Sequence, residues 1–314
     1  MEDLISKRQS QRVVNDPAGP LLPQVGMSNY TVELSANAHC ETGENPYWDP
    51  AQRIVYWTDI PAGRLFRYDV LAKDWERFYT GAQVGGFTLQ EDNSLLLFRV
   101  NEIVRLHADG RVEVLIAGID PQTGRFNDVI ADPEGRVFAG TMAKNGGDMS
   151  GALYRVDTDG TVTKLFSGTN TANGMGFSPD LQKFYWTDTT AFTIFEFDYD
   201  RASGEISNRR EFVNTAADEI KPDGMTVDRE GCVWSAIYGG GMIRRYSPEG
   251  ELMERVQLPV SRITSASFGG DELRELYITT AGGGDNSDTG DGALYRVAVE
   301  AQGRLEFRSR ILLQ

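Results

Sequence analysis

The sequence predicts an all-β protein, a six-bladed β-propeller with four-stranded antiparallel blades. A unit of 41 to 50 residues recurs six times, and each unit carries three short apolar runs in the same order. Short strands in units of this length are typical of propeller blades. A β-sandwich or barrel with accidental self-similarity is the alternative, and the recurrence of three features in phase favours the propeller.

The first run of each unit is expected to form the innermost strand of its blade. These runs are ENPYWD from Glu44, GFTLQE from Gly86, NDVIAD from Asn127, NGMGFS from Asn173, DGMTVD from Asp223 and SASFGG from Ser265. A large side chain opens a second run 11 or 12 residues later, and a third run such as GALYRVD alternates apolar and polar residues. Alternation with a period of two indicates a half-buried strand. The pairs Tyr56-Trp57 and Tyr185-Trp186 recur in the second run, so we interpret them as packing residues between blades.

The two ends of the chain compete for the outermost strand of the last blade. Residues 1–29 are rich in proline and glycine and are expected to form an N-terminal extension, and residues 30–314 the propeller. Both the run from Tyr30 to Ala36 and the run from Arg304 to Leu312 are suited to closing the ring. The sequence leaves the choice between them open.

Composition excludes several classes of function. A formal net charge of −15 disfavours nucleic acids and anionic membranes as partners, and no protein partner is implied. Two cysteines and two histidines exclude a four-cysteine or three-histidine zinc site. No apolar run is long enough to span a bilayer, and the first residues carry no secretory pattern, so a cytoplasmic location is expected.

Equivalent repeat positions meet at one end of a propeller's channel, and here they carry oxygen donors. Glu44, Asn127, Asn173 and Asp223 supply two carboxylates and two amides. Each is an ordinary turn residue when considered alone. Two carboxylates directed at one axis repel each other unless a cation lies between them. The pattern therefore predicts a site for one divalent metal ion, with Ca²⁺, Mg²⁺ or Mn²⁺ favoured and Zn²⁺ tolerated.

Four segments resemble the regucalcin (senescence marker protein), gluconolactonase and luciferin-regenerating enzyme family. They are GENPYWD (43–49), RFNDVIADPEGRVFAGTM (125–142), NGMGFSPD (173–180) and PDGMTVDREGCVW (222–234). The resemblance implies a six-bladed propeller that hydrolyses sugar-acid lactones with a divalent metal, and it places the metal ligands on the same four residues.

The resemblance also implies roles for individual residues. Asp223 becomes the general base as well as a ligand, while Arg125 and Asn127 bind the substrate. Asn145 stands where the family has an acidic substrate contact, so the preferred sugar acid is expected to differ. Asp128, next to a ligand, is either a supporting group for the metal site or a turn aspartate.

The leading functional hypothesis is a metal-dependent lactonase that acts on a small-molecule lactone. The metal would act as a Lewis acid on the lactone carbonyl while Asp223 activates a water molecule. Two alternatives remain: a phosphotriesterase-like hydrolase using the same metal site, and a calcium-binding regulatory protein without enzymatic activity.

Overall fold

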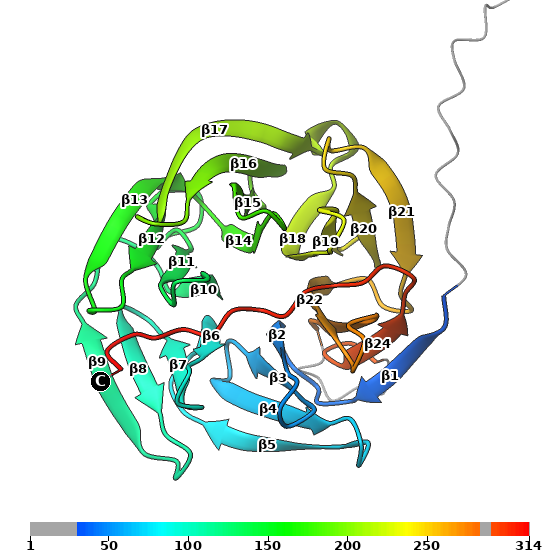
Figure 1. Cartoon of the computed structure of the whole chain (residues 1–314), viewed down its shortest axis with the longest axis horizontal. Coiled ribbons are helices and arrows are strands. Elements are labelled where there is room, and N and C mark those ends of the chain that lie inside the picture. The colour runs from blue at the N-terminus through cyan, green and yellow to red at the C-terminus, as the bar shows by residue number, and fades with distance from the viewer. Residues whose placement is uncertain (1–29, 283–289, 314) are drawn as a thin grey trace, which may run out of the picture.

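The computed structural model describes residues 30–282 and 290–313, and it confirms the six-bladed propeller (Figure 1). Six four-stranded antiparallel sheets surround a central channel, and the described residues contain a single short 3-10 helix, η1 (Ala216–Asp218). None of the described helical residues forms a segment able to cross a membrane. The predicted N-terminal extension, residues 1–29, lies outside the described residues.

The strands follow one another from the channel outward in each blade. Blade 1 contains β2 (Gly43–Asp49), β3 (Ile54–Asp59), β4 (Arg64–Asp69) and β5 (Asp74–Thr80), and blade 2 contains β6 (Gly86–Leu89), β7 (Leu95–Phe98), β8 (Glu102–Leu106) and β9 (Val112–Ala117). Blade 3 contains β10 (Phe126–Ala131), β11 (Val137–Thr141), β12 (Gly151–Val156) and β13 (Val162–Thr169), and blade 4 contains β14 (Ala172–Phe177), β15 (Lys183–Asp188), β16 (Thr193–Asp200) and β17 (Glu205–Asn214). Blade 5 contains β18 (Lys221–Val227), β19 (Val233–Tyr238), β20 (Met242–Tyr246) and β21 (Leu252–Gln257), and blade 6 contains β22 (Ile263–Gly269), β23 (Glu275–Thr280), β24 (Leu294–Ala298) and β1 (Val32–Ala36).

The aromatic pairs of the second run hold neighbouring blades together, as predicted. Tyr56 packs among the leucines of blade 2, whereas Trp57 faces the other way and shares a cluster with Tyr277 and Leu294 of blade 6. Adjacent residues of a strand point to opposite faces of the sheet, so one dipeptide serves both neighbours. Trp57 is 1% exposed, so its whole side chain contributes to the core.

The N-terminal strand closes the ring, which resolves the competition between the two ends of the chain. β1 pairs antiparallel with β24, with Val32 opposite Val297 and Glu33 opposite Arg296. The guanidinium of Arg296 donates to the Glu33 carboxylate at 2.6 Å. Blade 6 is therefore built from both ends of the sequence.

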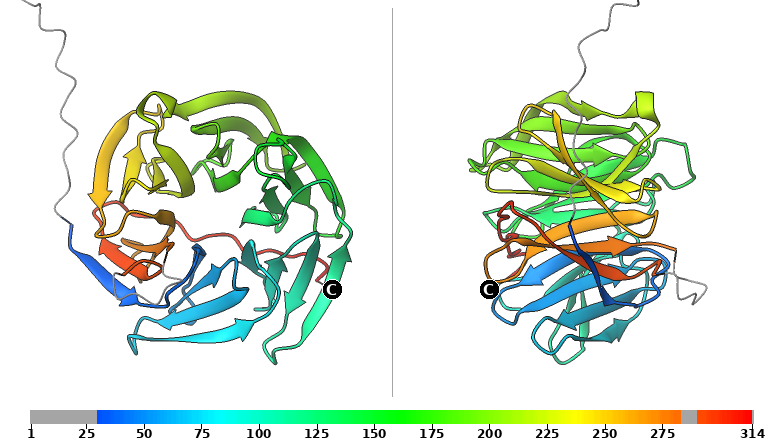
Figure 2. Two further views of the ribbon diagram at one scale, coloured as in Figure 1. Left: turned by 180° about the vertical axis from the view of Figure 1, so that it is seen from behind. Right: turned by 90° about the vertical axis from the view of Figure 1, so that its right-hand side faces the viewer.

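The C-terminal residues cross one mouth of the channel instead of joining a blade. We call residues 302–313 the C-terminal strap; Figure 1 shows it running across the ring, and the edge-on view of Figure 2 places its end at one face of the disc. Some of its contacts are with the far ends of inner strands. Arg308 pairs with Asp49 at 3.1 Å, and the Ser309 hydroxyl lies 2.7 Å from that of Thr88.

Candidate metal centre and active site

The four predicted ligands lie at the beginnings of inner strands, at the mouth opposite the C-terminal strap. Each of these strands changes its register with the next strand beside the ligand: between Glu44 and Tyr47 in β2, Phe126 and Asp128 in β10, Asn173 and Met175 in β14, and Pro222 and Met225 in β18. Such β-bulges add a residue on one strand and turn its side chain away from the regular alternation. The bulges therefore free these side chains to face the channel.

A chain of hydrogen bonds fixes the two amides. Arg125 Nη1 donates to Asn127 Oδ1 at 2.6 Å, and Asn127 Nδ2 donates to Asn173 Oδ1 at 2.9 Å. Asn173 Nδ2 in turn donates to the hydroxyl of Thr189 at 2.9 Å. A carbonyl oxygen has two lone pairs, so each amide oxygen keeps one for a further partner. The amide nitrogens are both occupied, which holds the oxygens in one orientation.

The two predicted acidic ligands are buried without enough partners. Glu44 and Asp223 are 3% and 5% exposed, and the Oδ1 atom of Asp223 has no hydrogen-bond partner among the described residues. Burial raises the pKa of Glu44 well above its usual range, and the charges of Asp223 and Asp128 raise it further. Burial also raises the pKa of Asp223, again assisted by the charge of Asp128. Buried carboxylates in this arrangement are stabilised by a cation.

Arg125 is the basic group beside these acids. Burial lowers the pKa of its guanidinium to about 10, while Glu44 and Asp223 act in the opposite direction. Its side chain also donates to the carbonyl of Phe126 at 2.9 Å. Arg125 thus supplies one positive charge to a site that contains two carboxylates, and the excess of negative charge remains.

These residues fit a divalent metal ion. The unpartnered Asp223 oxygen, the Glu44 carboxylate and the two oriented amide oxygens form a buried set of oxygen donors of the kind that hard cations prefer. Another group, Asp228, Glu230 and Cys232, also brings three ligand types together. Its carboxylates are already paired with the guanidinium of Arg245, at 2.7 Å and 2.5 Å. We therefore interpret that group as an ion-pair cluster.

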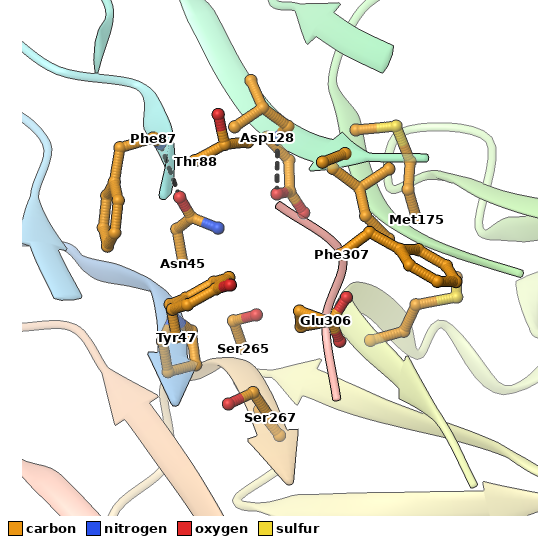
Figure 3. Close-up of a pocket in the computed structure, with 16 residues that line it drawn as sticks. Asn45, Tyr47, Phe87, Thr88, Asp128, Met175, Ser265, Ser267, Glu306 and Phe307 are labelled. Carbon is orange, nitrogen blue, oxygen red and sulfur yellow. Dashed lines mark hydrogen bonds between the residues drawn. The ribbon is translucent and has the colours of Figure 1, made fainter. Parts of the chain in front are cut away.

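The structure brings together all the predicted site residues except Asn145. Asn145 is exposed, and its backbone and side-chain nitrogens donate to Asp148 within the same loop, at 3.2 Å and 3.1 Å. Asp128 is buried, and its carboxylate accepts the Val129 N–H at 2.7 Å, the hydrogen bond drawn beside Asp128 in Figure 3. Burial and the charge of Glu306 raise the pKa of Asp128 to about 7, although the Val129 hydrogen bond opposes them.

In blade 6 the structural equivalent of the ligands is Thr264, one residue before the position that the repeat predicts. Asn127 donates to the carbonyl of Ala172, which precedes the ligand of the next blade, at 2.8 Å. Thr264 makes the same bond to the carbonyl of Gly43 at 2.6 Å. Aligning the apolar residue after each bulge, Val129 with Ala266, would have given this register. The sequence reasoning also missed Glu306, because nothing in the repeat connects the C-terminal strap with the channel.

Comparisons with known proteins identify the family of the chain. The chain is 43% identical over 292 residues to the pentonolactonase XacC of Haloferax volcanii, covering 90% of this chain and 99% of the relative. It is 35% identical over 269 residues to bovine (Bos taurus) regucalcin, covering 83% and 90%. A solved luciferin-regenerating enzyme superposes with a TM-score of 0.83 at 29% identity, covering 90% of this chain and all of the other. The SMP-30/Gluconolactonase/LRE-like region model matches residues 42–282. The chain therefore belongs to the SMP-30/gluconolactonase/LRE-like family.

Proposed function

We propose that this chain is a lactonase that uses one divalent metal ion to open sugar-acid lactones. One observation carries the metal dependence: Asp223 Oδ1 is buried next to a second buried carboxylate, Glu44, and no described residue donates a hydrogen bond to it. Two acids buried side by side favour the protonated form of at least one of them unless a cation joins them. The pentonolactonase relative supports the reaction class.

The ligand set in this proposal is Glu44, Asn127, Asn173 and Asp223. When bound, the divalent ion supplies Lewis-acid stabilisation of the oxygen that becomes negatively charged during ring opening. Asp128 is a supporting group next to the ligands in this proposal and is not itself a ligand. The hydrogen bonds from Arg125 through Asn127 to Asn173 keep the amide oxygens directed at one point.

Side chains of the protein carry out the remaining steps of the reaction. Asp223 takes a proton from the attacking water, whose oxygen forms the new bond to the lactone carbonyl carbon. The ring C–O bond then breaks, and the leaving alkoxide takes up the proton. Arg125 holds the substrate in place, because a guanidinium has five N–H groups and Nη1 is the nitrogen that contacts Phe126 and Asn127.

The substrate class that we propose is the lactone of a pentonic acid, ahead of the lactone of gluconic acid. The pentonolactonase relative, 43% identical to this chain over 99% of its own length, supports this order. Asn145, on the loop formed by residues 143–150, is an exposed amide that suits hydrogen bonds to sugar hydroxyls. The sequence also predicts that the glycine-rich loop of residues 282–291 shapes the pocket, and most of this loop lies outside the described residues.

A panel of lactones tests the proposal. Metal-stripped protein is mixed with five- and six-membered lactones of pentonic and hexonic acids, and with a phosphotriester, while Ca²⁺, Mg²⁺, Mn²⁺ and Zn²⁺ are supplied in turn. We expect lactone turnover that requires a metal, is highest for a pentonolactone and is lost in Glu44→Gln. The matched control, Glu134→Gln, replaces an acid whose ion pairs are on the surface and should retain full activity.

Three outcomes would contradict the proposal. Equal turnover with and without a chelator would show that the reaction does not require a metal. Absence of turnover with every metal, together with tight Ca²⁺ binding, would favour a calcium-binding regulatory protein. Faster cleavage of the phosphotriester than of any lactone would reassign the substrate class.

A further inference from the structure

Thr189 links two of the predicted metal ligands. It directly follows β15, whose last residue pairs with the first residue of β14, so it lies at the mouth of the channel where the ligands are. Its hydroxyl accepts a hydrogen bond from Asn173 Nδ2 at 2.9 Å and donates one to the carbonyl of Pro222 at 2.7 Å. Pro222 directly precedes Asp223 in β18. One hydroxyl therefore contacts a ligand of blade 4 and the backbone beside a ligand of blade 5.

The chemistry of the neighbouring groups fixes the direction of both hydrogen bonds. A carbonyl oxygen only accepts, so the single hydroxyl proton of Thr189 is committed to Pro222. Toward Asn173 the hydroxyl then offers only a lone pair, and the amide atom that faces it must be the nitrogen. The amide oxygen of Asn173 is thereby directed to the side of Asn127, whose Nδ2 donates to it at 2.9 Å.

The opposite end of the same chain of hydrogen bonds has an equally fixed direction. The guanidinium of Arg125 only donates, so the atom of Asn127 that it contacts must be the amide oxygen. Asn127 Nδ2 then donates to the carbonyl of Ala172 and to Asn173 Oδ1. The chain runs from a group that can only donate to a group that can only accept, so each amide oxygen between them has a single orientation. Thr189 connects the chain to its accepting end.

The bond from Thr189 to Pro222 also matches contacts at other junctions between blades. In blades 3 and 6 a side chain donates directly to the carbonyl that precedes the predicted ligand of the next blade. In blade 4 this link takes two steps, from Asn173 to Thr189 and from Thr189 to Pro222. The carbonyl before a ligand is thus held in the same way at three junctions, and Thr189 completes one of them.

The backbone holds Thr189 in place independently of its side chain. Its N–H donates to the carbonyl of Thr171 at 3.2 Å, and its carbonyl accepts the N–H of Phe192 at 3.1 Å. A change of side chain should therefore leave the loop in position and remove only the hydroxyl contacts. We propose that Thr189 is a positioning residue of the metal centre, whose hydroxyl orients the Asn173 amide and fixes the backbone next to Asp223. Its effect on metal affinity rests on the proposed function.

Metal affinity is the first test, and it needs no turnover. Metal-free protein is titrated calorimetrically with Ca²⁺, Mg²⁺, Mn²⁺ and Zn²⁺ in turn. Thr189→Val replaces the hydroxyl by a methyl group and should weaken binding by about 10–100-fold, the range for loss of a group that orients a metal ligand. Thr189→Ser keeps the hydroxyl and should bind nearly as tightly as the wild type. The matched control, Thr190→Val, removes a neighbouring hydroxyl that contacts Thr171 and should leave the affinity unchanged.

Hydrogen exchange of the Asn173 side-chain amide tests the orientation in metal-free protein. Heteronuclear NMR identifies these two protons as the pair of signals that disappears in Asn173→Asp. We expect slow exchange in the wild type and in Thr189→Ser. In Thr189→Val, which lacks the acceptor for one of the protons, exchange should be about tenfold faster.

The outcomes separate this inference from the proposed function. Wild-type metal affinity in Thr189→Val would overturn the positioning role, even if that variant melted at a lower temperature. Equal weakening in Thr189→Ser would also overturn it, because packing and not the hydroxyl would then set the affinity. Rapid exchange of the Asn173 amide in the wild type would refute the orientation without any variant. A wild type that binds none of the four ions, yet shows slow amide exchange that is lost only in Thr189→Val, would overturn the proposed function alone.

Discussion

Replacing Asp223 with asparagine is expected to raise the stability of the metal-free protein while it lowers the lactonase activity. The substitution removes a buried carboxylate whose Oδ1 atom has no hydrogen-bond partner within residues 30–282 and 290–313, and which lies close enough to Glu44 to raise that residue's pKa. Asparagine keeps the size of the side chain, so the change is almost purely electrostatic. In the metal-free protein the change removes a repulsion, whereas in the metal-bound enzyme it removes a ligand and the base.

The size of the stability effect follows from the geometry of a shared ion. Metal–oxygen distances of about 2.3–2.6 Å place ligand oxygens on opposite sides of an ion about 5 Å apart. Two unit charges at that separation repel by about 3 kcal/mol at an effective dielectric constant of about 20. For a chain of this length, about 3 kcal/mol corresponds to a rise of roughly 5 °C in melting temperature.

The pH dependence has a definite sign. Burial raises the pKa values of Glu44 and Asp223 in the folded state. The stability associated with a raised pKa is fully present below the unfolded-state value and is lost as the pH rises through the folded-state value. Chelated wild-type protein should therefore lose stability as the pH rises from the ordinary carboxyl range, about pH 4, toward neutral and above. Asp223→Asn should show a shallower loss.

Calorimetry in the presence of a chelator measures both effects, with Asn173→Asp as the reciprocal variant. Asn173→Asp adds a third carboxylate to the cluster and should lower the melting temperature where Asp223→Asn raises it. In steady-state assays with saturating metal, Asp223→Asn should reduce kcat/KM by about 10²–10⁴-fold, the range for loss of a general base. A chelated Asp223→Asn protein less stable than the wild type, or one with full activity, would refute the reasoning.

Three further substitutions probe the surroundings of the metal centre. Arg125→Lys should reduce kcat/KM by about 10–100-fold, because lysine cannot reproduce the contacts to Phe126 and Asn127. Hydrogen bonds to charged groups contribute about 1.5–3 kcal/mol, which gives this range. An unchanged kcat/KM would contradict the prediction. Gly174→Ala should weaken metal affinity measured by calorimetry, since the added Cβ would lie 2.6 Å from the Asp223 carbonyl oxygen and would displace that strand; unaltered affinity would show that the strand tolerates the shift. Asn145→Asp should change KM by less than about fivefold and leave the melting temperature nearly constant, because the residue is exposed; a collapse of kcat would instead assign it a catalytic contact.

The sequence predicts the propeller and the ligand cluster because both depend on the repeat. Once six units form a closed ring, equivalent positions must face one axis, and Glu44, Asn127, Asn173 and Asp223 are brought together by symmetry. The error at blade 6 has a physical cause. A β-bulge adds residues to a strand, as between Glu44 and Tyr47, so counting from the first residue of each run shifts the register that the apolar residues preserve.

The position of Glu306 at the channel and the closure of the ring depend on contacts that no repeat encodes. The run from Tyr30 to Ala36 and the run from Arg304 to Leu312 both have strand-like composition, and only the pairing of β1 with β24 separates them. Glu306 is an unremarkable acid in the sequence, and it acquires its burial from the path of the C-terminal strap. Interactions between distant segments of this kind escape local patterns.

The pairing of Val32 with Val297 has a consequence for folding while the protein is synthesised on the ribosome. β1 is the first of these strands to be synthesised, and it cannot pair until β24, the last strand, has also been synthesised. Until then five blades form an open arc, and the apolar sheet faces of blades 1 and 5 that blade 6 would cover are exposed to other nascent chains. Premature termination after blade 5 would therefore yield an aggregating fragment, and this architecture ties solubility to the completion of translation.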